Sequence, residues 1–330
     1  MSQREERLPE VVFLLSLPRS GSTLLQRMLA THPQISTVAE PWMLLPQVYP
    51  FVRKDLYASY RSVDFRAAAK DFFATLPESA RTYWQEVDRF IRRVYGILGG
   101  EARYFLDKTP RYSLIAPHLA SLFPESKFVF LFRNPLAIIA SINQVWGGGR
   151  WKIYTYKVDL FMGLENLLLA YESLLQEGRC IGIRYEDLLM EPEPVIARVC
   201  DYLKLPKELV DIQAFSQVQI SGVMGDPKRE VLQRLSQKPL TAWRETEWNP
   251  FRKIWARHYL HWIGEKRLAL MGYDLNSLLK DLNDVPLTPR YLLSDIVRFI
   301  AGGVYNFAQP VIFRDILYKV PAYHEICALR

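Results

Sequence analysis

The loop at residues 16–23, with the sequence SLPRSGST, combines residue types that bind an anion. An apolar run precedes the loop and an amphipathic segment follows it, so we expect the loop to connect a strand to the N-terminus of a helix. There, free backbone N–H groups and the helix dipole converge on one spot and attract negative charge. The pattern predicts a phosphate or sulfate site. Taken alone, it equally suits an ordinary turn in which Ser20 caps the helix.

The loop departs from the phosphate loop of nucleoside triphosphatases, G-x-x-x-x-G-K-[ST]. It keeps Gly21 and Thr23 but has Ser16 for the first Gly and Ser22 for the Lys. In triphosphatases that Lys neutralises the phosphates together with Mg²⁺, which an Asp at the end of a second strand helps to hold. Here the second long strand ends in Arg133. These departures favour an anion that needs no metal, such as a sulfuryl group, which Arg, Lys and backbone donors can stabilise alone.

A second candidate anion site follows the apolar run at residues 128–132. Arg133 closes that run, and Ser141 lies eight residues later on the helix that begins near Pro135. Arginine offers a planar fork to a phosphate, and serine offers a hydroxyl donor. The alternative is that Arg133 pairs with a carboxylate and Ser141 is a small packing residue. Two separate anion sites at one sheet edge match a donor with phosphates at both ends of its ribose.

These sites require strands that end at one edge of a sheet. Apolar runs predict buried strands, and a further short strand is expected before Glu40: residues 11–15, 104–106, 128–132, 180–184 and 36–39. Apolar periodicity predicts helices at residues 21–32, 67–76, 83–97, 112–123, 135–145 and 154–175. Strands that alternate with helices indicate a three-layer α/β fold with a mostly parallel central sheet. Ligands of such sheets bind beyond the carboxyl ends of the strands.

The 330 residues contain no internal repeat and no linker that would split the chain. We expect one α/β domain at residues 1–273 and a helical C-terminal extension at 274–330, where the apolar pattern becomes irregular, that packs on the domain, on a partner or on a membrane surface. Within the extension, residues 296–317 are apolar but interrupted by charges, too polar for a span of about 20 residues. A partly buried helix or an interfacial helix on a membrane is expected there.

The formal net charge of +7 suits anionic ligands, but the Lys and Arg residues are scattered and no groove-reading motif accompanies them. Nucleic acid is therefore not an expected partner. Cys180, Cys200 and Cys327 are too far apart to suggest a disulfide framework or a zinc site. Residues 1–10 lack the apolar core of a secretory signal, so we expect a cytoplasmic protein, with the inner face of a membrane as a second location. The sequence does not indicate an oligomeric state.

Three segments, in the correct order, resemble the family of sulfotransferases that use 3′-phosphoadenosine-5′-phosphosulfate (PAPS). Residues 13–41 are similar to the element that binds the 5′-phosphosulfate, residues 128–141 to the 3′-phosphate element, and residues 184–188 to a third segment of the family. The resemblance spans about residues 10–205. It is closest to bacterial sulfotransferases, with motif spacing of the tyrosylprotein and glycan type. It implies a P-loop-like fold and metal-free, in-line transfer to a hydroxyl, which leaves 3′-phosphoadenosine-5′-phosphate (PAP).

The resemblance also implies roles for individual residues. The residues that would contact the 5′-phosphosulfate are Arg19, Ser20, Gly21, Ser22 and Thr23. Those that would contact the 3′-phosphate and its surroundings are Arg133, Ser141 and Tyr185. Lys238 and Trp243 lie in a later region, where residues of relatives touch the donor and where core positions are equally expected.

A base must take the proton of the attacking hydroxyl. Glu40 follows the short strand and precedes a proline, which favours a fixed extended turn, and the resemblance places the catalytic carboxylate here. His32 and His118 are weaker candidates, because their helical positions favour structural roles. Lys108 ends a strand in the sequence DKTP and, with Arg19, is expected to stabilise charge on the bridging oxygen as the leaving group departs. The alternative for Lys108 is a salt bridge with Asp107 or another neighbour.

The acceptor is a hydroxyl of a glycan, a lipid, a phenol or another small molecule. Aromatic residues after the active-edge strands are candidates for its binding, although some should be core: Trp42, Tyr112, Trp146, Trp151 and Tyr154. Two other functions compete with sulfuryl transfer. A small P-loop kinase would need Mg²⁺ and a nucleoside triphosphate, which the missing Lys and Asp oppose. An inactive anion- or glycan-binding module would not need to retain Glu40, Lys108 and both anion elements.

Overall fold

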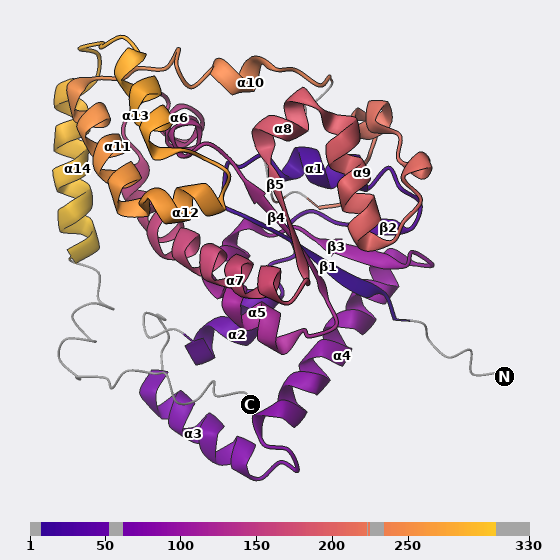
Figure 1. Cartoon of the computed structure of the whole chain (residues 1–330). Coiled ribbons are helices and arrows are strands. Elements are labelled where there is room, and N and C mark those ends of the chain that lie inside the picture. The colour runs from indigo at the N-terminus through magenta and orange to yellow at the C-terminus, as the bar shows by residue number, and fades with distance from the viewer. Residues whose placement is uncertain (1–7, 53–61, 223, 225–233, 308–330) are drawn as a thin grey trace.

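Figure 1 shows the computed structural model, which describes residues 8–52, 62–222, 224 and 234–307. Five strands form one sheet in the order β2-β3-β1-β4-β5, and every neighbouring pair is parallel. The strands are β1 (Glu10–Ser16), β2 (Ile35–Thr37), β3 (Tyr104–Asp107), β4 (Lys127–Phe132) and β5 (Cys180–Arg184). All five predicted strands are confirmed. With β1 and β4 adjacent at the centre, the two candidate anion elements lie side by side.

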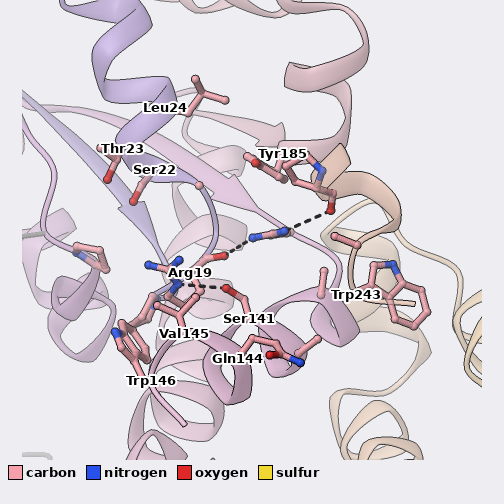
Figure 2. A pocket seen from close by; sticks show the side chains of 18 of the residues that line it. Arg19, Ser22, Thr23, Leu24, Ser141, Gln144, Val145, Trp146, Tyr185 and Trp243 are labelled. Atoms are coloured by element: carbon pink, nitrogen blue, oxygen red, sulfur yellow. Dashed lines mark hydrogen bonds between the residues drawn. The ribbon is translucent and has the colours of Figure 1, made fainter. Parts of the chain in front are cut away.

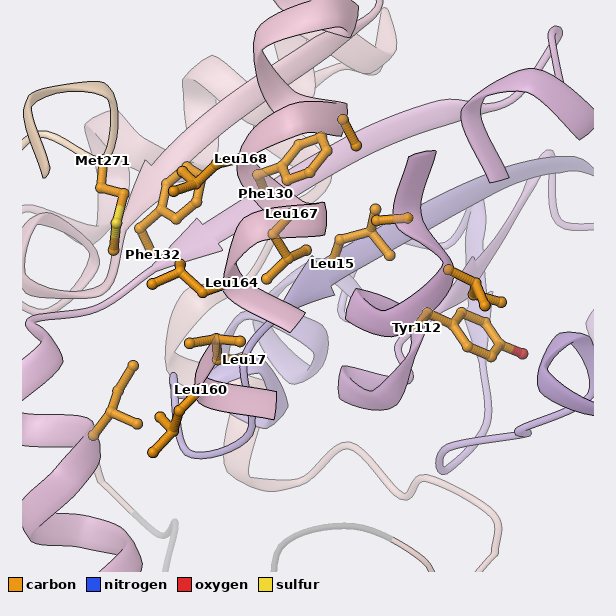
Figure 3. Close-up of a cluster of buried hydrophobic side chains, with 14 of the residues drawn as sticks. Leu15, Leu17, Tyr112, Phe130, Phe132, Leu160, Leu164, Leu167, Leu168 and Met271 are labelled. Atoms are coloured by element: carbon orange, nitrogen blue, oxygen red, sulfur yellow. The ribbon is translucent and has the colours of Figure 1, made fainter. Parts of the chain in front are cut away.

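The sheet is buried on both faces because its strands are apolar at successive positions. On β1, Val11, Phe13 and Leu15 belong to one core cluster, and Val12 and Leu14 belong to the other. The first face is covered by α2 (Leu44–Val52), α4 (Ala80–Gly99), α5 (Ala116–Leu122), α6 (Pro135–Val145) and α7 (Leu164–Gln176), and Figure 3 shows part of this core. The second face is covered by α1 (Ser22–Leu29), α8 (Tyr185–Met190) and α9 (Pro192–Leu203). The predicted three-layer α/β fold is confirmed.

Two of the predicted helices differ in form. The segment at 112–123 begins as the 3₁₀-helix η1 (Pro110–Ile115) and becomes α-helical only in α5, because Pro117 lacks the N–H that a continuous helix would need. The segment at 154–175 contains the 3₁₀-helix η2 (Ile153–Thr155) and a π-helical turn, η3 (Asp159–Gly163), before α7. Apolar periodicity continues across that turn, so it could not reveal the change of hydrogen-bond register.

The described C-terminal part of the chain is helical. It contains α10 (Lys238–Thr241), α11 (Pro250–Ile263), α12 (Glu265–Leu270), α13 (Leu275–Asp284) and α14 (Leu292–Phe307). The remaining α-helix, α3 (Ser62–Ala74), lies at the bottom of the view in Figure 1. The expected helical C-terminal extension is confirmed by α13 and α14. Residues 308–330, which include the end of the apolar segment at 296–317, lie outside the described residues. None of the described helices is both long enough and apolar enough to cross a membrane.

Candidate functional site

A cavity of about 910 Å³ opens beyond the carboxyl ends of the parallel strands, where ligands of this architecture bind. Its wall is built from the loops that follow β1, β2 and β3, from α6 and α8, and from the segment around α10. Figure 2 shows Arg19, Ser141 and Tyr185 converging from three of these elements. Residues distant in the sequence thus meet at one edge of the sheet.

The loop after β1 takes its shape from two residues with left-handed backbones, Arg19 at φ 69° and Gly21 at φ 89°. Gly21 caps α1 without any side-chain hydrogen bond, so Ser20 is not the helix cap. A Cβ on Gly21 would lie 2.2 Å from a ring carbon of Tyr185, so only glycine fits. The loop therefore packs directly on α8. Ser22 and Thr23 begin α1 on the cavity wall, at the helix end that attracts anions.

Arg19, Ser141 and Arg133 join the two predicted anion elements. The Arg19 Nε donates a hydrogen bond to Ser141 Oγ over 3.2 Å, and the Arg133 Nη1 donates to the backbone carbonyl of Arg19 over 2.8 Å. The bond between Arg19 and Ser141 is drawn in Figure 2. The side chain of Arg133 also lies over the Tyr185 ring, 4.5 Å from its centroid. The predicted elements are thus parts of one hydrogen-bonded wall.

The Arg133 guanidinium is buried without a full set of partners. Burial lowers the pKa of Arg133, with the nearby Tyr185 and Glu186 acting in the opposite direction. Within the described part of the chain, no carboxylate lies within ion-pair distance of it and its Nε has no hydrogen-bond partner. The alternative, in which Arg133 pairs with a carboxylate, is therefore not what the structure shows. A buried, incompletely paired cation on a cavity wall fits an anionic ligand.

Glu40 and Lys108 form an ion pair at the opposite side of the phosphate loop. Lys108 Nζ lies 3.0 Å from Glu40 Oε1 and 3.5 Å from Thr23 Oγ1, and the Trp42 indole N–H donates to Glu40 Oε2 over 3.2 Å. Glu40 lines the cavity, whereas Lys108 is almost completely buried behind it. The pair fixes the orientation of the carboxylate. It also places a cation next to the hydroxyl of Thr23.

The salt bridge between Lys108 and Asp107, which was the alternative for Lys108, does not form. Asp107 instead accepts hydrogen bonds from the hydroxyls of Tyr95 and Thr109, beneath the strand end. Burial raises the pKa of Asp107 to about 6, and these hydroxyls oppose the shift. Tyr112 belongs to the same buried group, and its hydroxyl accepts the backbone N–H of Leu44. This network anchors the segment that carries Lys108.

Most of the residues predicted to touch the donor line the cavity, together with the two uncertain candidates: Arg19, Gly21, Ser22, Thr23, Glu40, Arg133, Ser141, Tyr185, Lys238 and Trp243. Ser20 and Lys108 are buried behind the wall. His32 is buried and accepts a hydrogen bond from the Gln34 N–H, away from this wall. His118 does not line the cavity either.

The aromatic candidates for the acceptor divide into two groups. Trp42 and Trp146 line the cavity, but Tyr112, Trp151 and Tyr154 do not, so the expectation is wrong for these three. Tyr112 turns into the core beneath the sheet, as Figure 3 shows, and Trp151 packs against Phe251 and Trp255. Their positions after strands gave no indication of which way the rings point.

Two residues of the cavity wall, Tyr156 and Arg111, were not predicted. The Tyr156 ring stacks on Trp146 with centroids 4.2 Å apart, and Trp146 in turn lies 5.2 Å from the Arg19 guanidinium. The Arg111 Nε lies 3.1 Å from Oδ1 of buried Asp159. The two form an ion pair without hydrogen-bond geometry. Arg111 follows directly after the DKTP segment at the active edge, and this position could have indicated that it lies on the cavity wall. No sequence feature indicated the same for Tyr156, because it lies inside the helix predicted at residues 154–175.

Asp159 should make stability depend on pH. Burial raises the pKa of Asp159 from 3.8 to about 6, and Arg111 opposes the shift. As pH rises, the Asp159 carboxyl keeps its proton to a higher pH in the folded state than in the unfolded state. The protonated carboxyl therefore contributes fully to the free energy of unfolding below pH 4, and this contribution is lost as pH rises toward 6. We expect the unfolding free energy of the wild type, relative to Asp159→Asn, to fall by about 3 kcal/mol between pH 4 and pH 7 in urea titrations. A difference that does not change with pH would contradict this.

Comparison with known proteins gives these residues a family context. A family model described as "Sulfotransferase family" matches residues 9–209. The chain is 31% identical over 225 residues to the nodulation protein NoeE of Sinorhizobium fredii, with 60% of this chain and 51% of NoeE covered. It is 25% identical over 197 residues to protein-tyrosine sulfotransferase 2 of Gallus gallus, with 58% and 50% covered. The chain thus spans about half the length of these curated relatives. A solved sulfotransferase from Alicyclobacillus acidocaldarius is 14% identical, with a TM-score of 0.46 over 82% of this chain and 98% of that chain.

Proposed function

The chain belongs to the sulfotransferase family, and we propose that it transfers a sulfuryl group from PAPS to an acceptor hydroxyl. The observation that carries this proposal is that the loop after β1, Arg133 and Ser141 meet on the wall of one cavity. Two anion elements joined in one wall suit a donor with a phosphosulfate at one end and a phosphate at the other. A triphosphate would require neither the second element nor a buried arginine there.

The wall offers matching groups to both ends of such a donor. We assign the 5′-phosphosulfate to Arg19, to the start of α1 at Ser22 and Thr23, and to the backbone around Ser20 and Gly21, whose lack of a Cβ lets the loop seat on α8. A charged ligand at the incomplete hydrogen-bonding positions of Arg133 would compensate its buried charge. Ser141, Tyr185, Lys238 and Trp243 complete that end of the wall.

The chemical step requires a base on one side of the sulfur and positive charge on the other. We assign Glu40 as the base that takes the acceptor proton, because it is the carboxylate on the wall and two donors fix its orientation. Lys108 and Arg19 would stabilise the negative charge that develops as the bond to the leaving phosphate breaks. These cations supply the charge that a metal ion provides in kinases, so we propose transfer without a metal.

The acceptor would enter between Glu40 and the wall formed by Trp42, Trp146, Tyr156 and Arg111. Aromatic faces bind sugar rings, phenols and lipid chains alike, so the acceptor class stays at a hydroxyl of a glycan, lipid or phenol. We also propose that the protein works in the cytoplasm, with peripheral contact to the inner face of a membrane through its C-terminal segment.

A thermal-shift comparison tests the donor. PAP at about 100 times its dissociation constant should add about 2.7 kcal/mol, which raises the melting temperature of a protein this size by roughly 5 °C. ATP with Mg²⁺ should have little effect. Stabilisation by ATP with Mg²⁺ and none by PAP would instead identify a P-loop kinase. Binding of PAP with no transfer of labelled sulfate to any sugar, phenol or lipid alcohol would favour an inactive binding module.

A further inference from the structure

Helix α14 carries an apolar stripe on its outer side. Four of its residues are largely exposed at positions i, i+4, i+7 and i+11, which fall on one side of a helix: Leu293 at 80%, Val297 at 64%, Ile300 at 60% and Val304 at 64%. Scattered single apolar side chains are normal on protein surfaces, but a continuous row along one helix is not. The row spans about 16 Å at 1.5 Å per residue.

The opposite side of α14 is fixed to the protein, so the stripe cannot turn inward. Asp295 is completely buried and pairs with Arg252 over 2.7 Å, while it accepts hydrogen bonds from the Trp151 N–H and the Asn249 amide. At Gly302 a Cβ would lie only 2.6 Å from the side chain of Tyr154. Figure 1 shows α14 at the outer edge of the molecule, beside α11.

Two arginines lie beside the start of this stripe. A second cavity, of about 490 Å³, is lined by Arg150, Pro289, Tyr291, Leu292, Leu293, Ser294 and Arg298. Across the part of the chain that the structure describes, the guanidinium groups of Arg150 and Arg298 form no ion pair. The only acidic side chain of α14 is the buried Asp295. The surface therefore combines an apolar row with uncompensated positive charge.

We propose that the outer side of α14 docks on an anionic lipid bilayer, with the apolar row in the headgroup boundary and Arg150 and Arg298 on lipid phosphates. This deepens the membrane contact in the proposed function by naming its residues and its lipid class. Amphipathic helices bind membranes in this way, by buried apolar area together with attraction to anionic headgroups. The positive charge of Arg150 and Arg298 at the second cavity favours an anionic bilayer over a neutral one.

A second copy of the chain fits this surface less well. A two-fold contact through α14 would bring the same arginines of both copies to one interface, where like charges repel. The apolar row is about 16 Å long and about 10 Å wide, so it offers roughly 160 Å², against the about 800 Å² per partner of a stable interface.

The docking surface is also connected to the acceptor wall. Arg252, which holds Asp295, donates a hydrogen bond to the carbonyl of Gly149 over 2.7 Å. Gly149 lies in the short loop between Trp146, on the cavity wall, and Trp151, whose N–H is bound by Asp295. Attachment through α14 would therefore hold the acceptor wall at a fixed position relative to the bilayer.

Vesicle co-sedimentation of the full chain tests the proposal. Wild type should bind phosphatidylcholine vesicles that contain about one third phosphatidylglycerol, and bind pure phosphatidylcholine at least tenfold less tightly. The pair Val297→Asp and Ile300→Asp should reduce binding to the mixed vesicles at least tenfold. Ile97→Asp is the matched control, because Ile97 is a largely exposed apolar residue on α4, and it should bind like wild type. Arg150→Glu with Arg298→Glu should remove the preference for anionic lipid.

PAP-induced thermal stabilisation, measured on every variant, separates this proposal from the proposed enzyme function. It should stay unchanged in the α14 variants, which also shows that they fold. Failure of the full chain to bind mixed vesicles overturns the proposal. Equal loss in Ile97→Asp, or equal binding to neutral vesicles, overturns it too. A dimer in light scattering that Val297→Asp dissociates would assign the surface to a second copy instead.

Discussion

Glu40→Gln should lower turnover by at least about 10²-fold while PAP binds within about threefold of its wild-type affinity. Glutamine has the shape of glutamate and its carbonyl can still accept the hydrogen bond of Lys108, so only the bond from the Trp42 indole at the cavity rim is lost and the wall should keep its form. The amide cannot take a proton from the acceptor. Transfer of labelled sulfate from PAPS measures the first effect, and calorimetry with PAP measures the second.

Glu125→Gln provides the control for Glu40→Gln, because Glu125 is an exposed glutamate distant from the cavity wall. It should leave both measurements unchanged. Normal turnover in Glu40→Gln would remove Glu40 as the base. A parallel loss of PAP binding would instead show that the Glu40–Lys108 pair mainly supports the phosphate loop through Thr23.

Arg133→Ala should weaken PAP binding about 30-fold or more, the equivalent of at least about 2 kcal/mol. The change removes a buried cation that would face the 3′-phosphate, together with its hydrogen bond to the Arg19 carbonyl. PAP without its 3′-phosphate, adenosine 5′-phosphate, should lose much less affinity in this variant. Calorimetry with both nucleotides gives the two losses.

Arg179→Ala is the matched control for Arg133→Ala. Arg179 also donates to backbone carbonyls, those of Ala120 and Phe123, and lies over an aromatic ring, that of Phe128, but it is not on the cavity wall. Arg179→Ala should lower the melting temperature without changing PAP affinity at a temperature where both variants are folded. Equal affinity losses in both variants would reduce Arg133 to a structural residue and remove the argument for a two-ended donor.

The sheet and the phosphate loop could be predicted because their causes are local. Residues 11–15 are apolar at every position, as a strand covered on both faces requires, and the glycine and helix signals that follow define the loop. The order of the strands then brings Arg133 next to Arg19, which explains why two motifs more than a hundred residues apart could be combined correctly.

The remaining site features depend on side-chain directions that the sequence does not encode locally. The sequence left open a salt bridge of Lys108 with Asp107 or another neighbour. Asp107 instead turns inward to the hydroxyls of Tyr95 and Thr109, and Lys108 reaches Glu40. Tyr156 reaches the wall only because the chain between α6 and α7 breaks into short 3₁₀ and π turns. Neither outcome follows from composition or periodicity.

The hydrogen bond from Arg133 to the Arg19 carbonyl gives the cavity a fixed length. Because Arg19 is also bonded to Ser141, the two anion elements cannot move apart without breaking both bonds. If the proposed donor binds here, such a pocket would select nucleotides by the spacing between their two charged ends as well as by the charges themselves. Molecules with the same total charge but a different spacing would then contact one anion element and leave the other without its anion.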